Sequence, residues 1–213
     1  MVSGKQSVDD RKQYLAAIAA KVFWEKGYNT ASLRDIADKA KISKAGLYHY
    51  FRNKEDILTY IIAKNTEEGE ALLTACMADN EKGGVPPELA LKRVIQAYAT
   101  FVNQSKEVRS LVLRERHQLT GTNRVVLHRM EQRVFRMLRN ELRKLPQINE
   151  AYDVNVITFL IISMSHWMGY WLRDSGTLKL EAAINQGIDV IYHGVLRKGT
   201  RPGTPGRRQP SSN

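Results

Sequence analysis

The chain of 213 residues is 43% hydrophobic and carries 33 Lys and Arg against 22 Asp and Glu, a net charge of +11. This apolar content supports a core and excludes a disordered chain, while the positive charge favours nucleic acid, an anionic membrane or a phosphate-rich ligand as partner. The single cysteine, Cys76, excludes an intrachain disulfide and a Cys/His zinc set. Because the first residues are polar and lack the apolar stretch of a signal peptide, we expect a reducing, cytoplasmic location.

Apolar residues recur at helical spacing along nearly the whole chain, and no run alternates like a strand between hairpin turns. We therefore predict an all-α protein of about nine helices. The first helix covers residues 8–26, where Leu15, Val22 and Phe23 share one apolar face, and it ends at Gly27.

Two short helices are predicted next. Ser32 caps the first of them, with Asp35 three residues later in a capping box, and this helix ends near Lys39. After a tight turn, Ser43 opens a helix that continues to about Tyr50.

The remaining helices are longer. Asn53 caps a fourth helix, with Asp56 as its partner, that runs to about residue 79. The stretch "EKGGVPP" (81–87) is a clear break and a candidate module boundary. Further helices are predicted near 87–104, 106–118, 122–145, 150–174 and 180–197.

Two segments need separate comment. Residues 154–172 are apolar enough to suggest a membrane span, but they include Asn155, His166 and several hydroxyls, so a buried or interface helix is favoured and no membrane partner is expected. Residues 199–213 are rich in Pro, Gly, Ser and Arg, which predicts a disordered tail.

Residues 32–51 have the pattern of a helix-turn-helix, whose second helix can enter the DNA major groove. Residues 43–46 are small or flexible and would let the backbone approach DNA closely. Tyr48 and His49 would reach phosphates or bases. Leu47 and Phe51 are expected to point inward and hold the helix on its support. The competing interpretation is an ordinary helical hairpin with surface tyrosines.

The segment "GYNTASLRDIADKAKISKAGLYHYFRNKEDIL" (27–58) closely resembles the DNA-binding segment of TetR-family transcriptional regulators. The matching elements are Gly27-Tyr28, Ser32, Ile36-Ala37, Ala40, Ile42-Ser43, Gly46, Leu47-Tyr48, Tyr50-Phe51 and Lys54-Glu55. The resemblance implies an N-terminal helix-turn-helix DNA-binding domain over residues 8–55 and a C-terminal ligand-binding and dimerisation domain over residues 56–198.

The resemblance also implies the residues that contact double-stranded operator DNA. Carried over by position, Ser32, Arg34 and Lys54 would contact phosphates. On the recognition helix that Ser43 opens, Lys44 and Ala45 would face bases, and Tyr48 and His49 would reach backbone or bases. Three of these residues also have a purely structural interpretation. Ser32 would serve only as a helix cap, Arg34 as a solvated charge and Lys54 as a surface lysine.

One residue departs from the family pattern, because Lys41 stands where glycine is usual in the turn. A left-handed conformation at Lys41 would cost on the order of 1 kcal/mol. A phosphate contact would offset this cost; a slightly different turn would avoid it.

The C-terminal part is expected to supply a homodimer. Family members that resemble this chain dimerise through their last two long helices, here about 150–174 and 180–197. Both carry more apolar residues than one stripe requires, which favours burial on several sides. A dimer would also present two recognition helices to two half-sites.

A small-molecule effector is the second partner that the resemblance implies. The stretches "LVLRERHQLTG" and "HWMGYWLRDSG" resemble the C-terminal pattern of the subgroup that responds to acyl-coenzyme A thioesters. Aromatic rings beside arginines suit a ligand that is apolar at one end and phosphorylated at the other. A lipophilic cation and a free aromatic or fatty acid are the rivals, and core packing or a solvated charged face would explain the same residues. The candidate ligand-binding residues are Arg114, His117, Arg133, Trp167, Tyr170 and Trp171.

Enzymatic activity is not expected. The sequence has no G-x-S-x-G turn and no glycine-rich phosphate loop, and "HRME" (128–131) is half of a metal site without a partner motif. We therefore predict a TetR-type repressor that binds a palindromic operator as a dimer and is released by an effector, such as an acyl-CoA thioester. We expect it to need no cofactor or metal. The alternative is a multidrug- or aromatic-acid-responsive regulator of an efflux or catabolic operon.

Overall fold

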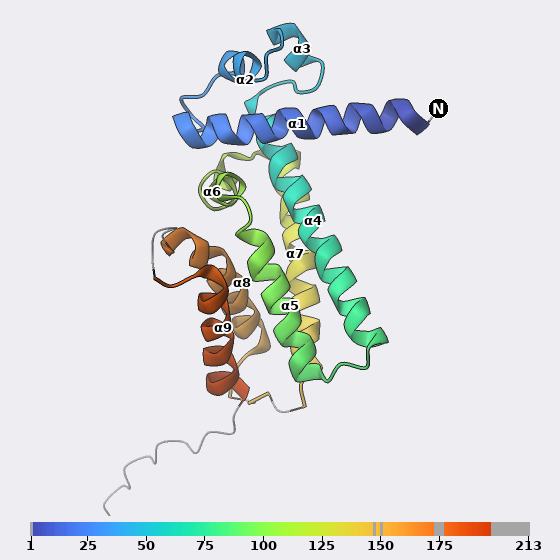
Figure 1. Cartoon of the computed structure of the whole chain (residues 1–213), viewed down its shortest axis with the longest axis vertical. Helices are drawn as coiled ribbons and strands as arrows, with labels where there is room; N and C mark the ends of the chain where they lie inside the picture. Colours follow the sequence, from blue (N-terminus) through green and yellow to red (C-terminus); the bar gives the residue numbers. More distant parts are fainter. Residues whose placement is uncertain (1, 147, 150, 173–176, 197–213) are drawn as a thin grey trace, which may run out of the picture.

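The computed structural model describes residues 2–146, 148–149, 151–172 and 177–196, which form helices and connecting turns only (Figure 1). This confirms the predicted all-α class and the count of nine α-helices within the described residues. The predicted tail at 199–213 lies outside them. The helices are α1 (Val2–Lys26), α2 (Leu33–Lys39), α3 (Lys44–Tyr48), α4 (Lys54–Lys82), α5 (Pro87–Val102), α6 (Lys106–Arg114), α7 (Gly121–Arg143), α8 (Val154–Trp171) and α9 (Leu180–Ile191).

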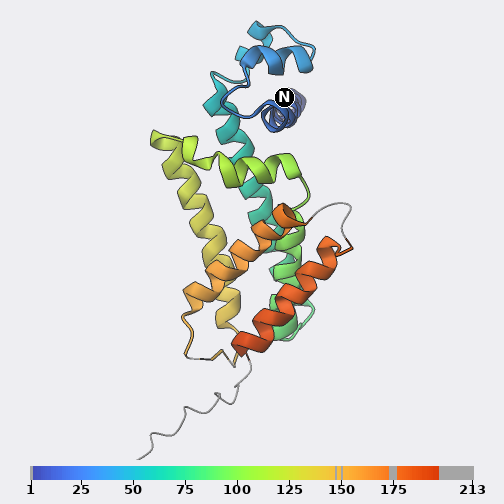
Figure 2. The ribbon, with the colours of Figure 1, turned by 90° about the vertical axis from the view of Figure 1, so that its left-hand side faces the viewer.

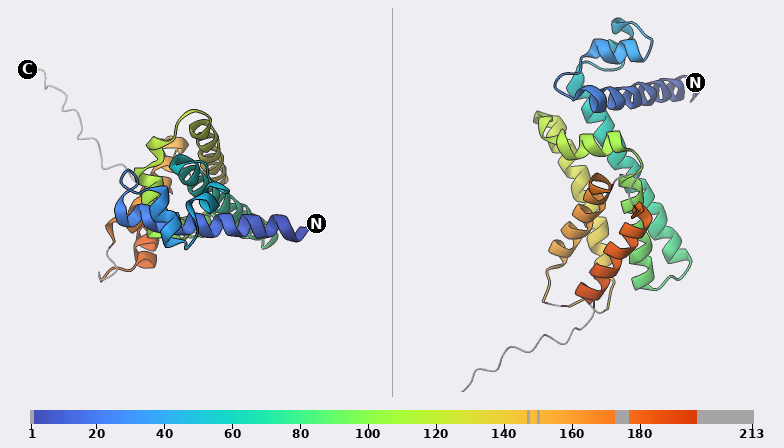
Figure 3. Two further views of the ribbon diagram at one scale, coloured as in Figure 1. Left: turned by 90° about the horizontal axis from the view of Figure 1, so that it is seen from above. Right: turned by 60° about the vertical axis from the view of Figure 1, so that its left-hand side comes forward.

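The helices form a small head on an elongated body. In the head, α1 lies across the end of α4, and α2 and α3 cover the opposite side of α1 (Figures 1 and 2). In the body, α4, α5 and α7 run alongside one another, and α8 and α9 pack against α5 (Figure 3). The short helix α6 lies between the two parts and contacts both α1 and α8.

Local capping sets the starts of several helices. The side chain of Ser32 accepts from the backbone N of Asp35, and the Asp35 carboxylate accepts from the backbone N of Ser32, so the predicted capping box is present. Asn53 likewise accepts from the backbone N of Asp56 at 2.8 Å. Because these signals act over three residues, they were readable in the sequence.

Some predicted boundaries were wrong. The first helix begins at Val2 rather than at residue 8, and α3 ends at Tyr48 rather than at residue 50. The helix predicted over 106–118 ends at Arg114, and a 3₁₀ turn, Arg116–Gln118, follows it. The last helix gives way at Ile191 to a π-helical turn, Tyr192–Leu196.

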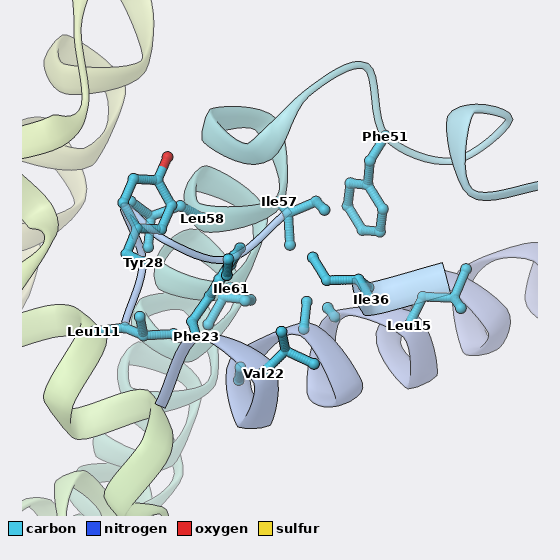
Figure 4. Packing of buried hydrophobic residues seen from close by; sticks show 14 of the residues in the cluster. Leu15, Val22, Phe23, Tyr28, Ile36, Phe51, Ile57, Leu58, Ile61 and Leu111 are labelled. Carbon is cyan, nitrogen blue, oxygen red and sulfur yellow. The ribbon is translucent and has the colours of Figure 1, made fainter. Parts of the chain in front are cut away.

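The head and the body share one apolar core. Figure 4 shows side chains of α1, α2, α4 and α6 converging, with Phe23, Ile36 and Ile57 all at most 2% exposed. The cluster continues into the body through Leu111 of α6 and Leu127 of α7. The head is therefore packed onto the body rather than linked to it by an exposed tether.

The apolar stretch around α8 belongs to a second core that it shares with α5 and α9. Within the described part of the chain, no helix is both long and apolar enough to cross a bilayer.

Candidate nucleic-acid interface and ligand cavity

The short helix α3 has one buried and one exposed face. Leu47 and Phe51 are 0% exposed, which confirms that they hold the helix on its support. The opposite face leaves five of the predicted DNA-binding side chains exposed to solvent: Ser43, Lys44, Ala45, Tyr48 and His49. Ser43 also caps the helix, because its Oγ accepts from the backbone N of Gly46 at 3.0 Å.

A surface groove of about 640 Å³ lies between the start of α2, the recognition helix α3 and the start of α4. It brings together five of the eight predicted DNA-binding residues: Ser32, Arg34, Lys44, Tyr48 and Lys54. Three of these side chains carry a positive charge and two carry a hydroxyl, which are the groups that bind phosphate oxygens. The arrangement is thus suited to one strand of a nucleic-acid backbone.

Lys54 has a structural role within this groove. Its Nζ donates to the carbonyl oxygens of Tyr28 at 2.8 Å and Asn29 at 3.0 Å, and it lies 5.0 Å from the centre of the Tyr28 ring. An ammonium group has three donors, so one donor is available beyond these two carbonyls. Lys54 therefore ties the start of α4 to the turn after α1, and its contact with phosphate stays a prediction.

The turn between α2 and α3 adopts the left-handed conformation considered for Lys41, whose φ is 55°. The backbone N of Lys41 donates to Asp38 O at 3.1 Å, and that of Ile42 donates to Ala37 O at 3.0 Å. This is the Schellman arrangement that usually places glycine at the left-handed position. The turn is thus closed with Lys41 in a strained backbone conformation.

A cavity of about 590 Å³ lies in the body between α4, α5, α6, α7 and α8. Most of its wall is apolar and aromatic, as small-molecule sites usually are. The described lining residues are Ile62, Asn65, Thr66, Gly69, Tyr98, Phe101, Val102, Val112, Leu113, Arg116, His128, Glu131, Gln132, Val134, Phe135, Phe159, Ile162, Ser163, His166 and Trp167.

Two polar pairs interrupt this wall. Arg116 Nη2 donates to Glu131 Oε2 at 2.7 Å, and burial raises the pKa of the Glu131 carboxyl although Arg116 opposes the shift. The Tyr98 hydroxyl lies 3.1 Å from His166 Nε2. Burial, with smaller effects of Arg116 and Arg109, lowers the pKa of His166 to about 4, so its ring is neutral at physiological pH.

The six predicted ligand-binding residues are not gathered at this cavity. Trp167 lines it, whereas the other five are absent from the lining. Arg114 donates to the Tyr170 hydroxyl at 2.9 Å, Arg133 is bonded to Glu70 at 3.0 Å, and Trp171 is 74% exposed. His117 lies 3.2 Å from the side chain of its neighbour Gln118.

Four polar residues of the cavity wall are not among the six predicted ligand-binding residues: Tyr98, Arg116, Glu131 and His166. A signal for one wall was present in the sequence. Positions 159, 162, 163, 166 and 167 recur at helical spacing, so they form a single face of α8. Which face of α8 turned inward could not be read from that spacing.

One contact joins the groove to the helices around the cavity. Glu55, beside Lys54 in the groove, accepts at Oε1 from the backbone N of Thr120 at 3.0 Å, from its hydroxyl at 3.1 Å and from Asn123 at 3.4 Å. These hydrogen bonds, that from the Thr120 backbone above all, lower the pKa of the Glu55 carboxyl. Thr120 and Asn123 stand at the start of α7, which lines the cavity further along.

The outer side of α8 and α9 exposes apolar side chains. Val156, Leu160 and Trp171 of α8 are 57%, 54% and 74% exposed, and Val190 of α9 is 72% exposed. By contrast, Ile157, Ile161, Ile184 and Ile188, which were among the residues that suggested an interface, are buried in the protein's own core. Among the described residues, no three His, Cys, Asp or Glu side chains are placed to hold a metal ion.

A helix-turn-helix with an exposed second helix is the element with which many transcriptional regulators enter the DNA major groove. The family model described as "Bacterial regulatory proteins, tetR family" matches residues 15–61, and that described as "Tetracyclin repressor-like, C-terminal domain" matches residues 84–195. The second match alone covers more than half of the chain. The protein therefore belongs to the TetR family of transcriptional regulators.

Individual relatives agree with this assignment. The HTH-type transcriptional regulator HbdR of Aromatoleum sp. (strain CIB) is 28% identical over 171 residues, which cover 78% of this chain and 72% of HbdR. The crystal structure of PfmR from Thermus thermophilus has a TM-score of 0.74 at 28% identity, and covers 84% of this chain and 97% of PfmR. The structure of AibR in complex with isovaleryl coenzyme A and operator DNA also has a TM-score of 0.74, at 22% identity, with 84% of this chain and 97% of AibR covered.

Proposed function

We propose that this TetR-family regulator is a repressor that binds a palindromic operator as a homodimer and is released by a small effector, an acyl-CoA thioester. The observation that carries the proposal is that residues 43–51, which include α3, have a buried side, Leu47 and Phe51, and an exposed side with five predicted DNA contacts. The alternative is a regulator of an efflux or catabolic operon that responds to lipophilic drugs or aromatic acids.

DNA would meet the head along α3 and the adjoining groove. Lys44 and Ala45, on the exposed side of the helix start, would face base edges in the major groove. Ser32, Arg34, Tyr48 and Lys54 would bind phosphates around the groove, which sets the register without reading sequence.

A homodimer is supported by the exposed apolar side chains of α8 and α9. A monomer would leave Leu160, Trp171 and Val190 largely in water. Large apolar side chains exposed on two neighbouring helices are typical of an interaction surface. Two copies related by a twofold axis would then place two α3 helices about one DNA turn, ~34 Å, apart.

An acyl-CoA effector is supported by the mainly apolar cavity, which suits an acyl chain, and by AibR, a protein of the same fold that binds isovaleryl coenzyme A. Ligand would shift the protein toward a state with a different half-site spacing. It achieves this only by its difference in affinity for the two states. The aromatic side chains Phe101, Phe135 and Trp167 in the cavity wall would also pack against an aromatic acid, the alternative effector.

The DNA-binding part is tested by a gel shift on the DNA upstream of the protein's own gene. Tyr48→Ala should abolish the shift, while the variant keeps its oligomeric state on a sizing column. Tyr152→Ala, which removes an equally exposed tyrosine from the body, is the matched control and should bind as the wild type does. An unchanged shift for Tyr48→Ala would contradict the assigned contact.

A further inference from the structure

The cavity wall contains an acidic and a basic side chain, and these two are paired with each other. Among its described lining residues, Arg, Lys, Asp and Glu are represented by Arg116 and Glu131, and these two are bonded at 2.7 Å. The pair bridges the 3₁₀ turn after α6 and the middle of α7. An entering ligand thus meets an ion pair rather than a single unpaired charge.

The other polar groups in the wall add hydrogen-bonding capacity without charge. His166 is held against the Tyr98 hydroxyl, and its buried Nδ1 has no hydrogen-bond partner. The lowered pKa of His166 keeps this imidazole neutral. Asn65, Gln132 and Ser163 contribute amides and a hydroxyl.

A charged ligand would disturb this balance. A carboxylate that approached Arg116 would also lie near the Glu131 carboxylate, and an ammonium group that approached Glu131 would lie near Arg116. The side chains of Arg116 and Glu131 are 52% and 29% exposed without a ligand. A charged ligand that covers the pair leaves a net charge against mainly apolar walls, where an unbalanced charge is unfavourable. An uncharged carbonyl, by contrast, would gain hydrogen bonds and leave the ion pair intact.

Resting on the regulator function above, we propose that the cavity binds an uncharged ligand group: an apolar body with a neutral carbonyl head, such as the acyl part of a thioester. The Arg116–Glu131 ion pair excludes free acids and cations. Any phosphate of such a ligand stays outside the cavity. The pair is therefore a specificity determinant of the effector site.

The test compares three probes with the same eight-carbon body on the full-length protein without DNA. They are octanoyl-N-acetylcysteamine as the neutral thioester, octanoate as the acid and octylammonium as the cation. Calorimetry supplies the affinities, and tryptophan fluorescence, to which Trp167 in the cavity wall contributes beside Trp24 and Trp171, gives a second readout. We expect the thioester to bind about tenfold more tightly than either charged probe.

Variants of the pair should change this order in opposite directions. Glu131→Gln leaves Arg116 without its partner and should raise the affinity for octanoate about tenfold, whereas Arg116→Gln should do the same for octylammonium. Glu81→Gln, which breaks the exposed contact with Lys144 at 3.3 Å elsewhere on the body, is the matched control and should keep the wild-type order.

Several results would overturn the proposal: wild-type protein that prefers octanoate or octylammonium, pair variants that fold by circular dichroism but keep the wild-type order, or no binding of any probe. If a pair variant fails to fold, the wild-type order alone decides. Operator binding is measured in parallel, because a protein that ranks the probes as expected but ignores DNA would refute the regulator function and leave this inference standing.

Discussion

The wild-type protein should be less stable in mild acid than at neutral pH because of His166. The variant His166→Gln should lack this part of the pH dependence. In the folded protein, burial above all, together with the cations Arg116 and Arg109, lowers the pKa of His166 to about 4 from the ordinary 6.5. Between these two values the unfolded chain binds a proton that the folded protein does not, so stability falls as pH drops through 6.5 toward 4.

The size of this effect follows from the pKa shift. Each pKa unit corresponds to about 1.4 kcal/mol, so the fully developed effect is about 3 kcal/mol. About 2 kcal/mol of it develops between pH 7.5 and pH 5. For a chain of this length, that difference lowers the melting temperature by about 4 to 8 °C.

The assay is thermal melting followed by circular dichroism at about pH 7.5 and pH 5 for wild type and two variants. His166→Gln keeps an amide that can bond the Tyr98 hydroxyl, and it should lose about 2 kcal/mol less than the wild type between the two pH values. His128→Gln removes an exposed histidine from the same cavity and should follow the wild type. An equal pH dependence in wild type and His166→Gln would refute the assignment of a buried, neutral imidazole.

Three further predictions concern the turn, the link between head and body, and the dimer. Lys41→Gly should raise stability by about 1 kcal/mol by relieving the left-handed backbone, as measured by melting, and a lower melting temperature would contradict the strain. Glu55→Ala should still bind operator and effector, but the effector should weaken its DNA binding by a smaller factor than in wild type. Anisotropy titrations measure this factor, with the exposed Glu68→Ala as control. An unchanged factor would show that the Glu55 contact carries no coupling. Leu160→Glu should convert the proposed homodimer to a monomer in light scattering, and a dimer of unchanged mass would exclude the α8 surface from the interface.

The features that were readable in the sequence are local ones. The capping box of Ser32 and Asp35 acts within one helical turn, so its residue types and spacing are enough to predict it. The inward positions of Leu47 and Phe51 follow from the same short-range periodicity. The beginning of α1 was missed because residues 2–7, which are mostly polar, carry no apolar stripe, although they continue the helix.

The cavity was harder to predict, because its polar pairs come from distant parts of the chain. Arg116 and Glu131 are separated by a turn and half of a helix, and Tyr98 meets His166 across 68 positions. Two tryptophans one helical turn apart have different surroundings, since Trp167 lines the cavity and Trp171 is 74% exposed. Both residues are tryptophans of the same helix, one turn apart. Only the packing of α8 against its neighbours therefore distinguishes them.

The packing of the head against the body bears on how the proposed DNA-binding and effector sites would be coupled. Leu111 and Leu127, next to cavity-lining residues on α6 and α7, belong to the same core as Phe51 and Ile57 beneath the recognition helix. Glu55 adds a polar contact between the same parts. A ligand that displaces α6 or α7 must therefore strain or move the head. Because coupling between two binding equilibria is reciprocal, the proposed release by an effector requires that operator DNA weaken effector binding by the same factor by which the effector weakens DNA binding.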